Sequence, residues 1–288
     1  DNTVNAWTAS AGSLPVDSDG NAPRMIYTWR GRIVLSGLLL DPQNWFMSKS
    51  DDPTNFDYSP VSPSGIDAVA GNNSELGKIG DVITALIPYT DDILVFGSDH
   101  EIRMMRGDPL DGGVISLISD TIGMAWGKAW CKDPYGYIYF VSNHMGIYMM
   151  VPGQSAPQRI SQQIEQVLKA VDTGVNGIKL AWNDAFQGLD VFITPLAAPG
   201  PTTHYHYDWR SKAWFPFAFA DENHNPLCCV TLDGNAAGDR VTLIGSWDGY
   251  VRKIDPSATD DDGTAIESSV VIGPMLTKDF DELILYDL

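Results

Sequence analysis

The chain has 288 residues, 44% of them hydrophobic, and its 37 acidic and 18 basic residues give a formal net charge of −19. This length can bury a large core, whereas an acidic chain without clustered Lys and Arg lacks the charge that holds nucleic-acid phosphates. We therefore expect no sequence-specific nucleic-acid binding. Because no run of 18 apolar residues is present, we also expect no transmembrane helix and no membrane insertion.

The three cysteines predict neither a disulfide framework nor a zinc site. The adjacent Cys228 and Cys229 would point to opposite faces of a strand, and Cys131 has no partner at a metal-binding spacing. We expect all three to be core thiols. The chain starts at Asp1 without a signal-peptide pattern and ends at Leu288 within an apolar run, so we expect a segment of a longer polypeptide.

Residues 1–81 predict a first group of strands with loops around it. The apolar residues 4–7 form the candidate for a closing strand that pairs with the last sheet, beside a strand at Val251 or Val270, because an unpaired edge is a liability. Residues 24–37 alternate like a strand pair. Residues 60–81 are rich in Ser, Gly, Asn and Pro with little periodicity, and they predict a long surface loop.

Residues 129–150 give the strongest pattern in the chain. Aromatic and β-branched residues recur there at every second position between turns rich in Gly, Asn and Pro, which is typical of a three-strand meander. Similar stretches recur along the chain with hydrophobic centres 61, 44, 52 and 51 residues apart, at Leu35, Phe96, Phe140, Phe192 and Leu243. Repeats of this length favour an all-β, five- or six-bladed β-propeller, with an irregular β-sandwich as the alternative.

One helix is expected, over about residues 158–171. Apolar residues recur at helical spacing, namely Ile160, Ile164, Val167, Leu168 and Val171, and Asp172 to Gly174 would end the helix. A helix inserted between blades packs on the rim of the propeller. We expect the propeller to span residues 1–263 and residues 264–288 to form strands that lead toward a domain absent from this chain.

Three places carry residue types that bind metals. Gly20 stands fourth rather than sixth in the 17–21 stretch and no Glu follows at the twelfth position, so this is a turn and not a calcium loop. Three acids at residues 260–262 should stay solvated. His204 and His206 share one strand face, but zinc needs a third ligand, and His100 and His144 belong to hairpin turns. We predict no metal, cofactor or catalytic site.

The strand sequences resemble a group of tailed-phage virion proteins, namely the β-propeller tail-tip, nozzle and DNA-stabilisation proteins of short-tailed phages. The resemblance covers about residues 24–170 and is carried by RIVL at 32–35, WFMS at 45–48, SDDPTNFD at 50–57, ILVF at 93–96 and GYIYFVS at 136–142. It implies a structural role in a virion and has no catalytic residues to transfer.

The main hypothesis is therefore a non-enzymatic component of a phage tail that acts through subunit assembly and DNA retention or passage. Its partners would be copies of itself in a ring and neighbouring virion proteins, contacted through residues 60–81, residues 197–203 and the terminal strands. Nine Trp and eleven Tyr leave a carbohydrate-binding, lectin-like propeller as an alternative. A propeller glycoside hydrolase is a second alternative. Asp190 and Glu101 are its only candidate acids, and both fit the exposed phase of a strand.

Overall fold

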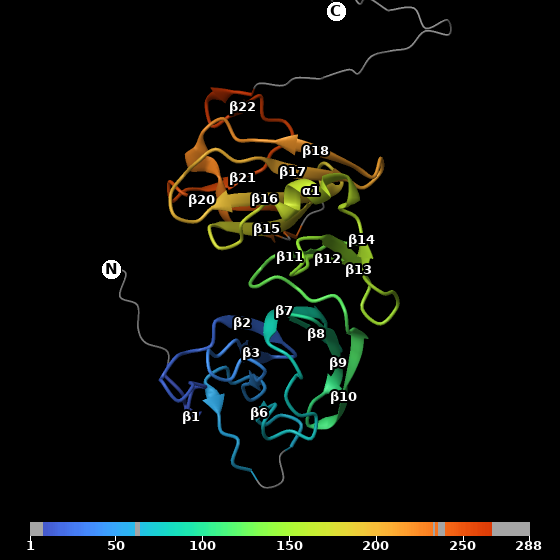
Figure 1. Cartoon of the computed structure of the whole chain (residues 1–288). Coiled ribbons are helices and arrows are strands. Elements are labelled where there is room, and N and C mark those ends of the chain that lie inside the picture. Colours follow the sequence, from blue (N-terminus) through green and yellow to red (C-terminus); the bar gives the residue numbers. More distant parts are fainter. Residues whose placement is uncertain (1–7, 61–63, 233, 236–239, 267–288) are drawn as a thin grey trace, which may run out of the picture.

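A computed structural model describes residues 8–60, 64–232, 234–235 and 240–266. Within these residues the chain forms five successive antiparallel sheets of three or four strands (Figure 1). The first sheet contains β2 (Met25–Trp29), β3 (Arg32–Ser36), β4 (Trp45–Met47) and β6 (Val69–Ala70), and the second contains β7 (Ile83–Thr90), β8 (Ile93–Ser98), β9 (Ile102–Asp108) and β10 (Asp111–Ser119). The third contains β11 (Trp130–Lys132), β12 (Ile138–Val141), β13 (Ile147–Met150) and β14 (Gln158–Arg159). The fourth contains β15 (Asn176–Asn183), β16 (Gly188–Pro195), β17 (His204–Asp208) and β18 (Ala213–Phe217), and the fifth contains β19 (Pro226–Leu232), β20 (Val241–Ser246) and β21 (Val251–Lys253).

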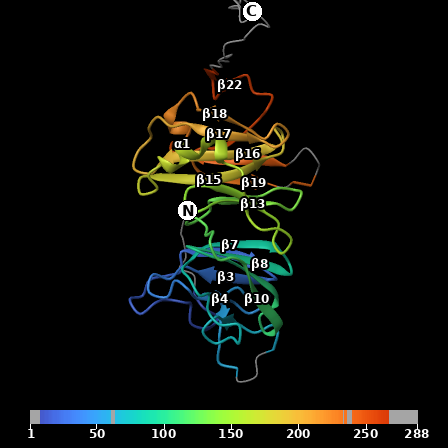
Figure 2. The ribbon, with the colours of Figure 1, turned by 45° about the vertical axis from the view of Figure 1, so that its right-hand side comes forward.

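The five sheets are the blades of a β-propeller arrangement. Inner strands β2, β7, β11 and β15 lie toward the middle of the molecule, and the later strands of each sheet lie further out (Figure 1). β2 lies against β7, and β15 lies against both β11 and β19. Figure 2 shows the first two sheets in one half of the molecule and the fourth and fifth in the other. The first and fifth sheets are therefore the two ends of the series.

The repeat found in the sequence corresponds to these blades. All five hydrophobic centres fall in the second strand of a sheet, namely β3, β8, β12, β16 and β20. In the third sheet Trp130 pairs with Phe140 and Phe140 with Tyr148, as the meander predicts. β8, β12 and β16 are almost wholly buried because a neighbouring sheet covers each of their faces. The prediction of a propeller is confirmed, with five blades in the described residues.

Apolar clusters fill every junction between neighbouring sheets. Trp45 and Phe96 meet between the first and second sheets, and Trp130 lies between the second and third. Tyr139 and Trp182 stack at 5.5 Å between the third and fourth. Between the fourth and fifth sheets the cluster is small and consists of Ala181, Phe192, Cys229 and Ile244.

The predicted helix is shorter than expected. Residues 162–169 form a 3₁₀ turn, η1 (Gln162–Ile164), followed by α1 (Glu165–Lys169), whereas Gln158 and Arg159 pair with β13 as the edge strand β14. The edge of the third sheet offers unpaired backbone groups, which outweigh the helical pattern there. Ser161 accepts a hydrogen bond from the Ile147 amide instead of capping the helix. Ile164 and Leu168 pack into the cluster between the third and fourth sheets, at the rim as expected.

The surface loop predicted over residues 60–81 is only partly correct. Residues 61–63 lie outside the described part, but Val69 and Ala70 form the buried strand β6 and complete the first sheet. The buried guanidinium of Arg32 donates hydrogen bonds to the carbonyls of Gly65 and Asp67 and so fixes the approach to this strand. A two-residue strand leaves no alternation in the sequence, which is why the pattern missed it.

Three smaller elements complete the described chain. β1 (Ala11–Gly12) pairs in parallel with β5 (Asn55–Phe56), and β22 (Asp260–Asp261) forms a hairpin with β23 (Thr264–Ala265). The expected domain boundary at residue 263 falls in the turn of this hairpin. The expected closing strand at 4–7 and the strands expected over 267–288 lie outside the described residues.

Candidate functional site

The fifth sheet presents one apolar face that no other part of the described chain covers with an apolar cluster. Along β19, Cys229 points inward to the fourth sheet, whereas Val230 and Leu232 point outward with 48% and 51% of their surface exposed. Val251 on β21 is 71% exposed. We call the outward side of this sheet the open face, and its residues are Cys228, Val230, Leu232, Val241, Leu243, Gly245, Val251 and Lys253.

The open face carries no carboxylate at any of these positions, although the chain has a net charge of −19. Strand pairing places Val230 beside Leu243 and Leu243 beside Lys253. The ammonium of Lys253 forms an ion pair with Asp255 at 2.8 Å. The face is thus apolar and close to neutral. Cys228, which we expected in the core, is exposed here, whereas Cys131 and Cys229 are buried free thiols.

The outward face of the first sheet is covered along β3 and β4 but not along β2, where Ile26 pairs with Leu35 and is 56% exposed. Leu35 and Phe46 lie there in a cluster with Phe56, which is 1% exposed. The segment after β1 adds Leu14 to this cluster, and the segment after β5 adds Tyr58. The β1–β5 pair holds these segments in place. The two ends of the series of blades therefore differ: the chain's own segments cover most of the first sheet's outward face, apart from Ile26, and leave that of the fifth sheet open.

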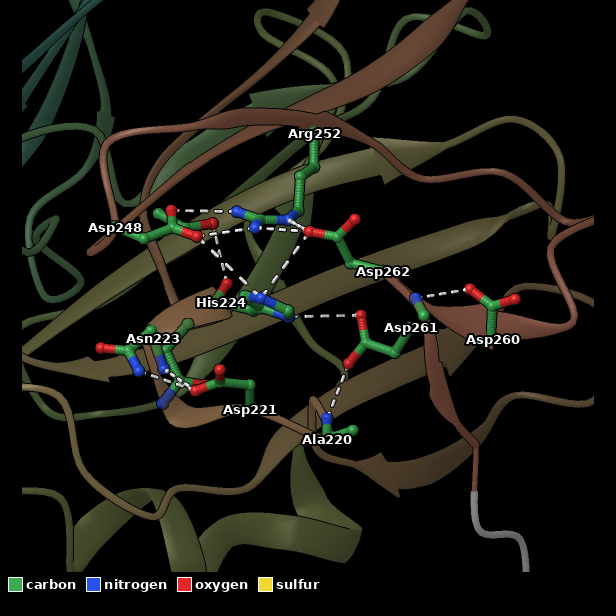
Figure 3. A network of polar contacts seen from close by, with 12 residues as sticks. Ala220, Asp221, Asn223, His224, Asp248, Arg252, Asp260, Asp261 and Asp262 are labelled. Carbon is green, nitrogen blue, oxygen red and sulfur yellow. Dashed lines mark hydrogen bonds and ion pairs between the residues drawn. The ribbon is translucent and has the colours of Figure 1, made fainter.

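A network of charged side chains holds one end of the fifth sheet together, and Figure 3 shows it. The guanidinium of Arg252 donates hydrogen bonds to Asp248 in the β20–β21 turn and to Asp262 in the β22–β23 turn. Asp261 accepts a hydrogen bond from the Ala220 amide. These contacts join the β22–β23 hairpin to the fifth sheet. Arg252 holds the pKa of Asp248 down at about 2 because it stabilises the charged form.

His224 lies inside this network with 8% of its side chain exposed. Its Nδ1 is 3.6 Å from Asp261, too far for a hydrogen bond, and Nε2 is 3.9 Å from both Asp248 and Asp262. The expectation that the acids at 260–262 stay solvated is therefore wrong for Asp261, whose side chain is 17% exposed, whereas Asp262 pairs with Arg252 but stays 58% exposed. Among the described residues no group of His, Cys, Asp and Glu is arranged to hold a metal ion.

The two candidate hydrolase acids are not exposed, which corrects the expectation from strand alternation. Asp190 is 4% exposed, and its carboxylate lies 2.6 Å from His206 and accepts a hydrogen bond from Asn183. Glu101 forms a bidentate ion pair with Arg103. They belong to the fourth and second blades, so the fold does not bring them together as an acid–base pair.

His204 is a core residue. It is fully buried, accepts a hydrogen bond from the Ile193 amide at Nδ1 and lies 3.0 Å from the side-chain oxygen of Asn225 at Nε2. Burial lowers its pKa to about 4, so the ring is neutral at pH 7. Both nitrogens are used by protein groups, which leaves none for a metal.

Comparison with known proteins supports the fold and no more. No family model and no curated protein sequence matches the chain. The structure of YCF48 bound to D1 peptide superposes with a TM-score of 0.51 at 10% identity, over 88% of this chain and 68% of that one. The extracellular domain of BT4673 from B. thetaiotaomicron gives a TM-score of 0.45 at 9% identity, over 92% of this chain but only 32% of its own length. The N-terminal domain of Nup159 gives a TM-score of 0.37 at 10% identity, over 85% of this chain and 61% of that one. In the described part of the chain no helix is long and apolar enough to cross a membrane.

The sequence carried a signal for the open face that we did not use. β19 is apolar on both phases of its alternation, with Cys229 on one and Val230 and Leu232 on the other. A strand of that kind predicts cover on both faces. The sequence pattern alone does not show that β19 belongs to the last described blade. Only the order of the sheets shows that the outward face of this blade has no neighbouring sheet.

Proposed function

We propose that this chain is a structural, non-catalytic component of a phage virion tail that acts through subunit assembly. The observation that supports an assembly role is the open face, where Val230, Leu232 and Val251 expose roughly half or more of their surface on one side of a single sheet. Contiguous apolar faces of this kind mark protein interaction sites. The virion setting rests on the resemblance of the strand sequences to tail proteins, and none of the three similar structures named above is a virion protein.

The partner that we propose for the open face is another copy of this chain. The chain repels its own copies through its net charge of −19, but the open face has no carboxylate, so two molecules can meet there without that repulsion. The first sheet is not an equivalent surface, because its outward face is covered along β3 and β4. A contact between the open face and a different surface of the next copy is heterologous, and such contacts build rings when the rotation closes.

In a ring of this type the acidic character also suits DNA retention or passage. A wall without clustered Lys and Arg offers DNA phosphates no cations to exchange for their counterions, so DNA passes without adhering. This part of the proposal requires acidic side chains on the inner wall of the ring.

Light scattering and negative-stain microscopy of the full chain test the proposal. We expect a closed ring of several copies, and a change of Val230→Asp together with Leu232→Asp should give a folded monomer because it places charge on the open face. Val114→Asp is the matched control, since Val114 is 56% exposed on β10 in the second blade. A wild-type chain that stays monomeric at high concentration would contradict the proposal.

A further inference from the structure

A second surface, on the outer part of the fourth sheet, combines exposed aromatic rings with a buried acid. Phe186, in the turn between β15 and β16, is 50% exposed, and Phe215 on β18 is 51% exposed. The ring of Phe186 meets that of His206 edge to face at 6.0 Å. Phe215 is the cross-strand partner of His206, so the two side chains lie on the same face of the sheet. His206 therefore lies beside both exposed phenylalanines.

The His206 ring is held in one orientation by groups beneath it. Its Nδ1 lies 2.6 Å from Asp190, whose side chain is 5% exposed. Asp190 also accepts a hydrogen bond from Asn183 at 2.9 Å, through its other carboxyl oxygen. With Asp190 as the acceptor, this contact places a proton on Nδ1 of His206 and directs Nε2 away from the carboxyl group.

Gly188 leaves room for this arrangement. A Cβ at this position would lie 2.5 Å from both Cε1 and Nε2 of His206, so a larger residue would displace the ring. His206 keeps 17% of its side chain exposed. The buried Asp190 therefore supports a partly exposed imidazole ring that lies beside two half-exposed phenylalanines.

We propose that Phe186, His206 and Phe215 form a binding site for a neutral saccharide. Sugar rings present C–H faces that pack on aromatic side chains, and their hydroxyl groups can donate to or accept from an imidazole nitrogen such as Nε2. Asp190 beneath the ring, together with the net charge of −19, disfavours anionic ligands. An entirely apolar ligand would leave the oriented imidazole without a partner. The site is independent of the open face and of the assembly role.

Saturation-transfer NMR with a panel of neutral mono- and disaccharides tests this site in the full chain. For the saccharide that binds, titration calorimetry should show affinity at least about tenfold weaker for Phe186→Ala and for Phe215→Ala, since each removes one packing surface. Both side chains are half exposed, so these variants keep the fold. Asp190→Asn should also weaken binding because the proton on Nδ1 is no longer fixed, and its circular dichroism must match that of the wild type.

Tyr250→Ala is the control, because Tyr250 is 68% exposed in the fifth blade and should leave affinity unchanged. Three outcomes would overturn the proposal. One is a panel in which no neutral saccharide binds saturably. Another is saccharide binding that survives both phenylalanine changes. The third is preferential binding of a trimethyl-lysine peptide, which would show a cation site instead.

Discussion

The two ends of the propeller differ in how far the chain covers their outward apolar faces. Every inner junction has a blade on each side, but the first and fifth sheets each have one face without a neighbouring sheet. On the first sheet the chain covers β3 and β4 with Leu14, Phe56 and Tyr58 and leaves Ile26 of β2 exposed. On the fifth sheet Val230, Leu232 and Val251 are all exposed. Exposed apolar area of this kind costs free energy in water. The difference teaches that more apolar side chains are available for a partner on the open face than on the largely covered first sheet.

The largest expected effect comes from changing equivalent leucines at the two ends. Leu35 and Leu243 occupy the same place in the repeat, but Leu35 is 4% exposed under the cover while Leu243 is half-buried on the open face. We expect Leu35→Ala to lower the free energy of unfolding by about 4 kcal/mol and Leu243→Ala by about 1 kcal/mol. Urea unfolding under monomeric conditions measures both. Equal losses would show that the two faces are covered equally.

The junction beneath the open face should be sensitive to acid through His204. The pKa of His204 in the folded chain is about 4, below the ordinary value of 6.5. As the pH falls from 6.5 to 4, the unfolded chain therefore binds a proton at this ring and the folded chain does not. The free energy of unfolding should fall by about 3 kcal/mol over this window in addition to other titrations. The contribution of the neutral His204 to the free energy of unfolding is fully present above pH 6.5 and is lost as the pH falls toward 4.

Urea unfolding at pH 7 and pH 4.5 isolates this contribution. His204→Gln should show a smaller difference between the two pH values than the wild type, since the group that titrates is gone. His100→Gln is the control because its side chain is 75% exposed and paired only with Asp81 at the surface. If His204→Gln and the wild type lose the same stability on acidification, burial of a neutral ring is not what governs this junction.

A smaller loss is expected from the charged network that joins the β22–β23 hairpin to the fifth sheet. Arg252→Met removes the hydrogen bonds to Asp248 and Asp262 and should cost about 1 kcal/mol at neutral pH. Asp248 has a lowered pKa, so the wild-type stabilisation is present above about pH 4 and disappears as the pH falls toward 2. The wild type and the variant should therefore converge in acid, whereas Arg106→Met, at a largely exposed position, should change little.

The smallest effect is expected at Val251, the most exposed residue of the open face. Val251→Thr keeps the β-branched shape and should change the free energy of unfolding of the monomer by less than about 0.5 kcal/mol. A loss near 2 kcal/mol in chemical denaturation would mean that the face is covered within the single chain. The contrast between the two ends would then disappear.

Much of the fold could be predicted from sequence, because sheet positions repeat. Leu35, Phe96, Phe140, Phe192 and Leu243 mark the second strand of every blade, since each must be apolar in the same phase. The helix was predicted too long because Gln158 and Arg159 pair with a sheet edge that local periodicity does not describe. Asp190 was expected in solvent because strand alternation does not reveal that His206 and Asn183 lie beside it.

The candidate site was harder to predict because it also depends on contacts between segments that are far apart in the sequence. An open face is defined by what does not pack on it, and a sequence window around Val230 or Leu232 looks like any buried strand. The saccharide site joins residues from a turn and three strands, at 186, 190, 206 and 215, whose proximity depends on the register of the fourth sheet. Both sites therefore follow from tertiary structure and not from local motifs.

The most direct test of the central claim is the reaction rate of Cys228 with a maleimide as a function of protein concentration. Cys228 is the exposed free thiol on the open face, whereas Cys131 and Cys229 are buried and should react slowly throughout. If copies assemble through this face, labelling of Cys228 should slow markedly as assemblies form and recover when Val230→Asp and Leu232→Asp disperse them. An assembled ring in which Cys228 reacts as fast as in the monomer would contradict the account.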